Sequence, residues 1–484
     1  MAHYHLIGVC GTAMASLAGM LLARGHDVTG SDANVYPPMS DELARLGVPV
    51  ALGYDPANLA KKPDVVVVGN AIRRGNPEVE YVLERRWRYA SLPEVLRREF
   101  LWGKRVLVVT GTHGKTTTTA LAAHVLTVGG LAPTFLVGGV AENFGSSFRV
   151  TESDYVVLEG DEYDTAYFDK GPKFMHYLPE IGIVNNVEYD HADIYPDLDA
   201  VKLAFRRFVN LIPRTGACVV GFDSPHARDA ASRSLAPLES FALDAPDAIW
   251  RAADLTYTET GMRFRVTRRG EPFGTFELPT FGDFNARNAL AVVAAAALWG
   301  VAPERIAEGL ATFQAVKRRM QLRGEVGGIA VIDDFAHHPT AVRETLAALA
   351  RRFPGRPLTA VFEPRSWSSR KRVFQEVYPD AFDAARQVIV APVFGSEEVP
   401  AADRFSPERL VADLAARGKQ AAVVAGADAI VDYLLPRLAP NEVVAALSNG
   451  GFGGLHDKLL TALRARQGQA DQPAAAWGSS GSAG

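Results

Sequence analysis

Residues 107–119 contain the feature that most constrains the fold, an apolar segment that runs directly into a glycine-rich loop. The segment reads Leu-Val-Val-Thr-Gly-Thr-His-Gly-Lys-Thr-Thr-Thr-Thr. Gly111 and Gly114 allow a tight turn whose backbone N–H groups face phosphate oxygens. Lys115 can reach the β- and γ-phosphates of a nucleotide, and the Thr116 hydroxyl can bind Mg²⁺. The pattern therefore predicts a strand and a phosphate-binding loop, the core of a nucleotide-binding α/β domain.

The loop departs from the usual phosphate-loop pattern at one position. That pattern places a glycine five residues before Gly114, where this chain has Val109. An ordinary turn between a strand and a helix is the alternative interpretation. The stretch from Thr117 to Val128 is helix-compatible, however, so a bound phosphate would also meet a helix N-terminus. We therefore expect a nucleoside triphosphate to bind here.

Length and composition describe a large protein of several domains. Its 484 residues are too many for one ordinary core, and 48% of them are hydrophobic and 22% charged. The formal net charge of −4 gives no general attraction to nucleic acid or to anionic membranes. Two cysteines cannot form a disulfide framework, and no apolar run approaches the roughly 20 residues that span a bilayer. We expect a cytoplasmic protein with small-molecule substrates, no nucleic-acid or membrane partner, and a monomeric or weakly dimeric state.

Alternating apolar segments and helical patterns predict an α/β protein of three domains. Residues 1–98 should form a Rossmann-like N-terminal domain. Residues 99–318 should form a central P-loop ATP-binding domain with a mostly parallel sheet. Residues 319–466 should form a C-terminal, doubly wound, Rossmann-like domain, and the Gly/Ser/Ala-rich tail, 467–484, should be disordered. The apolar segments expected to be strands are His5–Val9, Val28–Gly30, Val65–Val68, Arg105–Val109, Tyr155–Leu158, Ile181–Asn185, Ala217–Gly221, Ile329–Ile332, Leu358–Phe362, Gln387–Ala391 and Val443–Leu447, with an antiparallel region at 249–278.

The first strand leads into a glycine turn that suggests a second nucleotide site. It ends in Gly8-Val-Cys-Gly11-Thr-Ala-Met14, and Gly30-Ser-Asp32 closes the second strand. An acid about 20 residues after a glycine turn is typical of a dinucleotide fingerprint. The first two glycines are three residues apart rather than two, which disfavours a nicotinamide cofactor. A Rossmann-like site for a nucleotide diphosphate and a purely structural βαβ turn both remain open.

Two acidic clusters follow predicted strands of the central domain. The first is Glu159-Gly-Asp-Glu162-Tyr-Asp164, and the second is Glu188-Tyr-Asp-His191-Ala-Asp193. Because α/β sites are built at the carboxyl ends of strands, Glu159 can hold Mg²⁺ opposite Thr116, and His191 can bind metal or orient a carboxylate. Solvated acidic loops and an ordinary surface histidine are the alternatives.

Four further motifs carry polar groups at element ends. Asn285 and Asn288 precede an alanine-rich helix and can cap it or pair with a nucleobase edge. The cations 317–319 are either a solvated run or the source of a charge for a transferring phosphate. Residues 333–338, Asp-Asp-Phe-Ala-His-His, fit no closed zinc site, which favours a role at a domain interface. The glycine-rich turn 448–454 suits contact with an anion or a peptide backbone.

These motifs, in this order, resemble the Mur ligase family over about residues 4–465. The shared marks are Gly8-x-x-Gly11-x-x-Met14, Thr110-Gly-Thr-His-Gly-Lys-Thr-Thr117, Glu159-Gly-Asp-Glu162, Asp190-His191-x-Asp193, Asn285-x-x-Asn288 and Asp334-Phe-Ala-His337. Longer stretches are similar to those members of the family that use a murein tripeptide. They are Gly30–Met39, Gly69-Asn-Ala71 with Arg74–Pro77, Phe168-Asp-Lys170, Glu363-Pro-Arg-Ser366 and Ser448–Gly454.

The resemblance implies an ATP- and Mg²⁺-dependent ligase. Such an enzyme would activate the carboxylate of UDP-N-acetylmuramate as an acyl phosphate and join it to L-alanyl-γ-D-glutamyl-meso-diaminopimelate, in peptidoglycan recycling. The alternative within the family is a ligase that adds L-alanine in de novo synthesis. Outside it, a nucleotide-sensing protein without chemistry and a nicotinamide dehydrogenase remain as alternatives.

The resemblance also implies roles for individual residues. The expected catalytic residues are Lys115, Glu159, His191, Arg319 and His337. The expected ATP contacts are Gly111, Thr112, His113, Gly114, Lys115, Thr116, Thr117, Asn285, Asn288, Arg319 and Asp334. The expected metal ligands are Thr116, Glu159 and His191. The expected UDP-sugar contacts are Gly11, Thr12, Met14, Ser31, Asp32, Asn70, Gly139 and Asn143. The expected peptide contacts are Arg365, Ser366, Asn449 and Gly450.

Two positions depart from the family's pattern. Phe284 stands where relatives usually have the histidine of the adenine motif, and it can stack on a base but cannot hydrogen-bond to it. Phe205 stands where some members carry a carbamylated lysine, and Lys202 is only nearby. The sequence therefore gives no basis for predicting a carbamate at Lys202.

Overall fold

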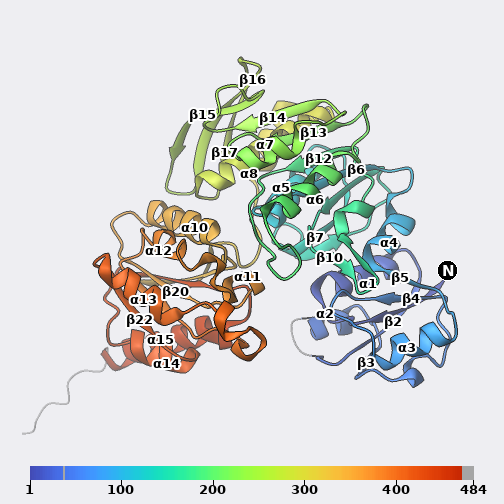
Figure 1. Cartoon of the computed structure of the whole chain (residues 1–484). Coiled ribbons are helices and arrows are strands. Elements are labelled where there is room, and N and C mark those ends of the chain that lie inside the picture. Colours follow the sequence, from blue (N-terminus) through green and yellow to red (C-terminus); the bar gives the residue numbers. More distant parts are fainter. Residues whose placement is uncertain (36–38, 471–484) are drawn as a thin grey trace, which may run out of the picture. The chain divides into compact units, whose positions relative to one another are not determined.

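The computed structural model describes residues 1–35 and 39–470 (Figure 1). The chain divides into two compact units between Lys317 and Arg318, and each is described by itself. The last helix, α15, continues to Ala470, so the first four residues of the tail that was expected to be disordered are helical. The rest of that tail, 471–484, lies outside the described residues. So do residues 36–38 of the stretch Gly30–Met39.

The N-terminal sheet of the first unit is entirely parallel, with strand order β3-β2-β1-β4-β5. This order reverses between β1 and β4, which is where doubly wound sheets bind ligands. The prediction of a Rossmann-like domain is confirmed. The strands are β1 (His3–Ile7), β2 (Asp27–Asp32), β3 (Val50–Leu52), β4 (Val65–Val68) and β5 (Tyr89–Ser91). The helices are α1 (Thr12–Ala23), α2 (Met39–Arg45), η1 (Pro56–Leu59), α3 (Pro77–Glu84), α4 (Leu92–Leu96) and the π-turn η2 (Arg97–Leu101).

The central sheet has ten strands in the order β17-β16-β15-β14-β13-β12-β6-β9-β7-β8. Its middle, from β15 to β7, is parallel, and its two ends are antiparallel, so the prediction of a mostly parallel sheet is confirmed. The strands are β6 (Arg105–Thr110), β7 (Thr134–Ala141), β8 (Ser146–Arg149), β9 (Tyr155–Glu159), β12 (Ile181–Val184), β13 (Ala217–Gly221), β14 (Leu238–Ala242), β15 (Trp250–Tyr257), β16 (Met262–Arg268) and β17 (Glu271–Leu278). The hairpin β10 (Asp164–Ala166) and β11 (Asp169–Pro172) lies outside this sheet.

Helices cover the central sheet on both faces. One core cluster joins the sheet to the alanine-rich helix α8, and another continues from the N-terminal sheet into the opposite face through residues such as Tyr4, Phe100 and Phe208. This shared apolar core explains why the N-terminal and central regions form one unit. The helices are α5 (Lys115–Val128), η3 (Lys173–His176), α6 (Leu198–Val209), α7 (Pro225–Ala231), α8 (Asp283–Leu298) and α9 (Pro303–Ala311).

The second unit holds a six-stranded sheet in the order β18-β19-β23-β20-β21-β22. Only β18 is antiparallel to its neighbour, so the predicted doubly wound domain is confirmed. The strands are β18 (Gln321–Val326), β19 (Ile329–Asp334), β20 (Leu358–Phe362), β21 (Gln387–Val390), β22 (Gln420–Val423) and β23 (Val443–Leu447). The helices are α10 (Pro339–Arg352), α11 (Trp367–Arg370), η4 (Arg372–Phe374), α12 (Tyr378–Ala381), η5 (Ser396–Glu398), η6 (Ala401–Asp403), α13 (Pro407–Ala416), α14 (Ala427–Leu434), η7 (Phe452–Gly454) and α15 (Leu455–Ala470). Across the described parts of both units, none of the helices combines the length and apolar character needed to traverse a bilayer.

Candidate active site

The phosphate loop between β6 and α5 depends on two glycines. Gly111 and Gly114 have φ angles of +137° and +80°, which L side chains rarely adopt. A Cβ at Gly114 would lie 2.5 Å from Oδ1 of Asn288, and a Cβ at Gly111 would lie 3.1 Å from the backbone nitrogen of Asn186. Helix α5 begins at Lys115, two residues earlier than predicted, so the lysine occupies the first turn beside its N-cap, Gly114. The loop is thus held close to its neighbours in a conformation that suits phosphate.

Four asparagines lie around this loop, two after β12 and two in α8. Asn186 accepts a hydrogen bond from the His113 N–H (2.8 Å) and donates one to the His113 carbonyl (3.2 Å). Asn185 donates to Thr118 (3.0 Å), and its buried Oδ1 accepts no hydrogen bond within the described chain. Asn285 and Asn288, expected at the adenine or at a helix cap, are buried and joined to each other (3.2 Å). The N-cap of α8 is Gly282, so these two side chains are not caps.

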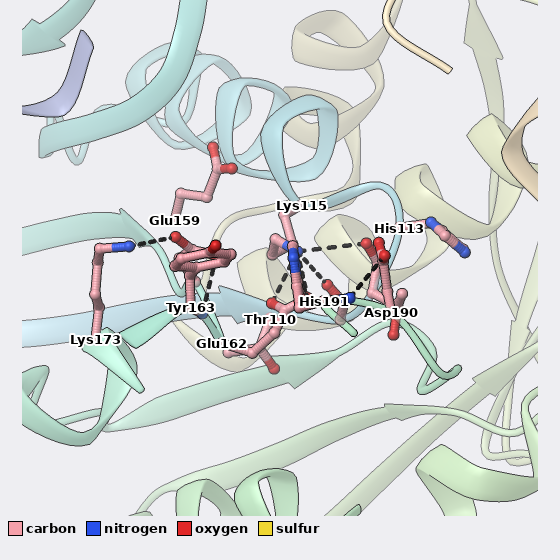
Figure 2. Close-up of polar contacts among 12 residues, drawn as sticks. Thr110, His113, Lys115, Glu159, Glu162, Tyr163, Lys173, Asp190 and His191 are labelled. Atoms are coloured by element: carbon pink, nitrogen blue, oxygen red, sulfur yellow. Dashed lines mark hydrogen bonds and ion pairs between the residues drawn. The ribbon is translucent and has the colours of Figure 1, made fainter. Parts of the chain in front are cut away.

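Lys115 meets a carboxylate at the centre of the site (Figure 2). Its Nζ donates to both oxygens of Glu162 (3.0 and 2.8 Å) and to the Gly111 carbonyl (2.8 Å). The Glu162 side chain is 1% exposed, and its Oε1 also lies 3.2 Å from Nε2 of His191. His191 has a φ of +54°, in the left-handed region, as residues at functional sites often do. The structure therefore brings together two predicted catalytic residues, Lys115 and His191, through a third that was quoted only as part of a motif.

The charges of this cluster stabilise one another. Burial lowers the pKa of Lys115, but the negative charges of Glu162 and Asp161 outweigh burial and raise it above its ordinary value. Burial also lowers the pKa of His191, yet its contacts with Glu162 and Asp190 raise the pKa to about 9. For Asp161, burial is outweighed by Lys173, Lys115 and His191, which hold the pKa of its carboxyl well below the usual range. At neutral pH the cluster therefore contains a protonated Lys115, a protonated His191 and an ionised Asp161.

Glu159 and Thr116 form a second oxygen-rich group beside the loop. Oγ1 of Thr116 donates to Oε1 of Glu159 (3.0 Å), and the backbone N–H of Gly138 donates to its Oε2 (2.6 Å). A Cβ at Gly138 would lie 2.8 Å from this carboxylate, so only glycine lets it approach. Burial raises the pKa of Glu159, which indicates a carboxylate short of positive charge. Hard oxygen ligands of this kind fit Mg²⁺.

A second group of possible metal ligands lies next to the first. A carboxylate oxygen of Asp161, one of Glu162 and a ring nitrogen of His191 all lie within 4.8 Å of one another. His191, expected to bind metal with Thr116 and Glu159, instead contacts Glu162 in this structure. The oxygen donors of Thr116 and Glu159 fit a divalent cation, whereas binding of a cation at the second group requires that His191 first lose its proton.

A cavity of about 640 Å³ opens at the carboxyl ends of β1 and β4, within the range of ordinary ligand pockets. Gly11 is the N-cap of α1 and Thr12 its first residue, so the cavity includes a helix N-terminus that suits a diphosphate. Asp32 supports the turn by accepting a hydrogen bond from the Cys10 N–H (2.9 Å). Five of the expected UDP-sugar contacts line the cavity, namely Gly11, Thr12, Met14, Asp32 and Asn70.

The other three expected sugar contacts lie elsewhere. Ser31 is fully buried, and its hydroxyl donates to the buried carboxylate of Glu78 (2.5 Å), so it supports the sheet beneath the cavity. Asn143 donates to the Thr312 carbonyl (2.9 Å) and accepts from the Gln314 N–H (2.8 Å). Gly139 packs near Val316 and the methyl group of Thr116.

The segment that follows β9 connects the cavity to the phosphate loop. Glu162 on this segment pairs with Lys115, while Asp161 beside it pairs with Lys173 (2.6 Å). Lys173 also lines the cavity, and Asn70 donates to the backbone carbonyl of Asp164 (2.7 Å). The two sites are therefore parts of one connected structure.

In the second unit, the predicted residues Arg319, Asp334 and His337 lie around the end of β19. Asp334 is buried and accepts hydrogen bonds from the N–H groups of Met320 (2.6 Å) and Ala336 (2.8 Å). Burial raises the pKa of its carboxyl, and the nearby charge of Arg319 partly opposes this. The Arg319 guanidinium lies 5.0 Å from the centre of the Phe335 ring. Nδ1 of His337 lies 3.0 Å from the Phe335 carbonyl.

The expected peptide residues gather at the ends of β20 and β23. The Arg365 guanidinium stacks on Phe394 at 3.8 Å from the ring centre and covers Gly450 so closely that a Cβ there would overlap it. Ser366 is the N-cap of α11 and accepts from the Ser369 N–H (3.2 Å). The buried Oδ1 of Asn449 accepts no hydrogen bond from the described residues.

Arg318, the residue next to the expected Arg319, supports the glycine-rich loop 448–450. Its guanidinium donates to the carbonyls of Ser448 (2.7 Å) and Gly450 (2.6 Å) and lies 3.4 Å from Asp333.

The structure locates the two positions that depart from the family's pattern, Phe205 and Phe284. Phe205 is fully buried against Phe174, and Lys202 on α6 pairs with Asp229 on α7 (2.5 Å). Phe284 lies in the first turn of α8.

The site residues that the sequence did not predict are chiefly Asp161, Glu162, Lys173 and Asn185. The first two stood in a motif that pointed to metal, but no sequence signal paired Glu162 with Lys115 or brought Lys173 to the cavity.

Three family models match the chain in order. The model for the Mur ligase family, catalytic domain, matches residues 3–100, the Mur ligase middle domain matches 109–296, and the Mur ligase glutamate ligase domain matches 318–450.

Individual proteins match over nearly the whole length. The chain is 40% identical over 469 residues to the UDP-N-acetylmuramate–L-alanyl-γ-D-glutamyl-meso-2,6-diaminoheptandioate ligase of Haemophilus influenzae, covering 96% of this chain and 100% of the relative. It is 39% identical over 464 residues to the protein of the same name from Escherichia coli, covering 95% and 98%. The crystal structure of a murein peptide ligase from Psychrobacter arcticus is 35% identical and superimposes with a TM-score of 0.73, covering 96% and 99%.

Proposed function

Because this chain belongs to the Mur ligase family of ATP-dependent ligases, we propose that it joins L-alanyl-γ-D-glutamyl-meso-diaminopimelate to UDP-N-acetylmuramate. One observation carries the proposal beyond family membership. A single unit holds a phosphate loop and a separate cavity with a helix N-terminus, and one segment pairs with lysines at both. Such an arrangement suits a reaction between a sugar nucleotide and ATP.

The reaction converts an unreactive carboxylate into an amide. A carboxylate oxygen of the muramate attacks the γ-phosphorus of ATP, the bond to the β,γ-bridging oxygen breaks, and ADP leaves. The amine of the peptide then attacks the carbonyl carbon of the acyl phosphate, the carbon–oxygen bond to phosphate breaks, and the nitrogen loses a proton. Negative charge develops on phosphoryl oxygens in the first step and on the carbonyl oxygen in the second, so cations around both are the chief catalytic requirement.

The chain's own residues provide these cations. Lys115 would release part of its contact with Glu162 and hold the β- and γ-phosphates, while the glycines at 111 and 114 turn backbone N–H groups toward them. The family resemblance implies that Arg319 contributes a further positive charge, and His337 a hydrogen bond, to a phosphate. Asn285 and Asn288 would act from behind the loop rather than on the adenine directly, since both are buried.

Mg²⁺ would be held by Thr116 and Glu159, with the group around His191 as a second position. When bound, the ion would neutralise negative charge on the phosphate oxygens and so reduce their repulsion of the attacking carboxylate. Glu159 is kept in place for this by the Gly138 N–H.

The peptide is the feature that separates the two family alternatives. Two relatives at 39–40% identity over the full length carry the name of the tripeptide ligase, which favours the tripeptide over free L-alanine. Arg365 and the loop at Asn449 and Gly450 would bind the peptide, with Ser366 fixing the start of α11. A guanidinium suits the carboxylates that a diaminopimelate residue carries.

We further propose that the protein works in the cytoplasm, where ATP and UDP-sugars are available, and that it acts as a monomer or weak homodimer. Light scattering of the purified chain tests the latter.

A substrate panel tests the proposed function. Purified protein is incubated with UDP-N-acetylmuramate, ATP and Mg²⁺, together with the tripeptide or with L-alanine, and ADP and the amide product are measured. We expect turnover with the tripeptide and at least tenfold lower kcat/KM with L-alanine. Preferred use of L-alanine would establish the alternative ligase. ATP binding without ADP release in every mixture would indicate a nucleotide sensor.

A further inference from the structure

Lys173 is a cation of the central region that reaches the cavity of the N-terminal sheet. The other residues that line this cavity lie between Gly8 and Asn76, whereas Lys173 begins η3, far along the chain. Its side chain is only 14% exposed. A lysine buried to this degree is unusual unless its charge is paired or used.

The position of Lys173 is fixed by two contacts. Its Nζ donates to Oδ2 of Asp161 (2.6 Å) and lies 5.4 Å from the centre of the Tyr163 ring. In Figure 2, its ammonium end points toward the Glu159 end of the cluster, on the side away from His113. An ammonium has three N–H donors, so the bond to Asp161 leaves capacity for a second anion.

The cavity is lined by groups that suit two different anions of a sugar nucleotide. The N-terminus of α1 at Gly11 suits a diphosphate. Lys173 lines the same cavity and bonds to Asp161, the neighbour of Glu162, which pairs with Lys115. A carboxylate held by Lys173 would therefore lie beside the segment that leads to Lys115, where it is to meet the γ-phosphate.

We propose that Lys173 binds the lactyl carboxylate of UDP-N-acetylmuramate and makes the enzyme select sugar nucleotides that carry it. This inference rests on the proposed function and adds a residue to its substrate site. Arg73 and Arg74 also line the cavity, where Arg74 pairs with Glu80 in two hydrogen bonds (2.9 and 3.0 Å) and Arg73 donates to the backbone carbonyls of Asn70 and Ile72. Lys173 differs from them because it bonds to Asp161, the residue next to Glu162, which is the partner of Lys115 at the phosphate loop.

Calorimetric titration of the full chain with two sugar nucleotides tests this directly. UDP-N-acetylmuramate carries the lactyl carboxylate, whereas UDP-N-acetylglucosamine has a hydroxyl group at that position. In Lys173→Met we expect the Kd for UDP-N-acetylmuramate to rise about 10- to 100-fold, as for a lost charged hydrogen bond, and the Kd for UDP-N-acetylglucosamine to change less than about twofold. Lys173→Arg should keep most of the preference, because it keeps the charge.

Lys104→Met is the matched control. Lys104 also pairs with an aspartate, Asp154 (3.0 Å), and is 22% exposed, but it lies just before the first residue of β6, whereas the phosphate loop follows the last. The Lys104→Met variant should leave the affinities for both sugar nucleotides unchanged. Equal weakening of both ligands in Lys173→Met, or no weakening of either, would overturn the inference.

The thermal midpoint of each variant separates a binding effect from unfolding. If Lys173→Met does not fold, Lys173→Arg and Lys173→Gln provide the comparison. The inference is supported if Lys173→Gln loses the preference for UDP-N-acetylmuramate over UDP-N-acetylglucosamine while Lys173→Arg keeps it. Failure of the proposed function would be seen separately, as absence of amide product from the wild-type protein.

Discussion

Gly114→Ala tests whether the phosphate loop works through its close contact with the asparagines behind it. Gly114 has a φ of +80°, and an alanine there costs about 1–2 kcal/mol in backbone conformation alone. Its Cβ would also lie 2.5 Å from Oδ1 of Asn288 and 3.2 Å from Nδ2 of Asn185. Asn288 is buried and bonded to Asn285, so the loop must move rather than the asparagine. Displacements approaching 1 Å at a catalytic group cost about 100-fold in rate.

Gly130→Ala is the control for the conformational cost of placing an alanine at a positive φ. Gly130 follows the same helix, α5, with a φ of +85°, but a Cβ there meets nothing within 4 Å. We expect Gly130→Ala to lose about 1–2 kcal/mol of stability and Gly114→Ala at least as much, and each kcal/mol lowers the thermal midpoint by about 2–4 °C. Turnover should fall about 100-fold in Gly114→Ala alone. Turnover in Gly114→Ala within threefold of that in Gly130→Ala would refute the reasoning.

Three further predictions address other parts of the molecule. Lys115→Ala should lower turnover by about 10³-fold through lost charge stabilisation. Its Kd for UDP-N-acetylmuramate by calorimetry should stay within twofold, because the cavity lies apart, and parallel loss of both would contradict the layout. Glu78→Gln tests a buried carboxylate. Burial raises the pKa of Glu78, but hydrogen bonds from His5, Ser31 and Asn58 outweigh burial and hold it below its ordinary value of 4.5. The stabilisation is therefore complete above about pH 4.5 and is lost as pH falls through the folded-state pKa. The difference in thermal midpoint between wild type and Glu78→Gln should shrink from pH 7 to pH 3.5, and an unchanged difference would show that the charge contributes nothing. Gly450→Ala should raise the KM for the tripeptide about tenfold by displacing Arg365, with steady-state kinetics as the measurement. Gly451→Ala, whose Cβ meets nothing within 4 Å, should not, and equal effects would exclude the contact as the cause.

Local patterns predicted the elements that carry the sites, because they depend on neighbouring residues. The apolar run Val65–Val68 is a buried strand to the residue, and the phosphate loop lies between strand and helix as expected. The first strand was placed two residues late, at His5–Val9. It ends at Ile7 because Gly8 turns with a φ of +82°. Sequence spacing alone did not reveal where that turn begins.

Contacts between distant segments were beyond prediction from one sequence. Ser31 and Asp32 are adjacent, but only Asp32 lines the cavity, because the hydroxyl of Ser31 meets Glu78, 47 residues away. The same holds for the pairing of Lys115 with Glu162. A sequence motif identifies residues that can bind a ligand. Which other side chains these residues contact in the absence of the ligand depends on the tertiary fold.

The pairing of Lys115 with Glu162 has a consequence for which ligands the loop admits. The ammonium already has a counter-ion, so an incoming anion must compete with a buried carboxylate that offers two oxygens at 3.0 and 2.8 Å. If the anion displaces Glu162 from Lys115, the buried Glu162 carboxylate keeps its contact with His191 but loses the one with Lys115. Leaving a buried charge less well paired costs free energy. A bare anion such as sulfate or inorganic phosphate does not relieve that cost, whereas a ligand that arrives with its own cation does. The resting site is thus electrically balanced in a way that discriminates between a free anion and a metal-loaded nucleotide.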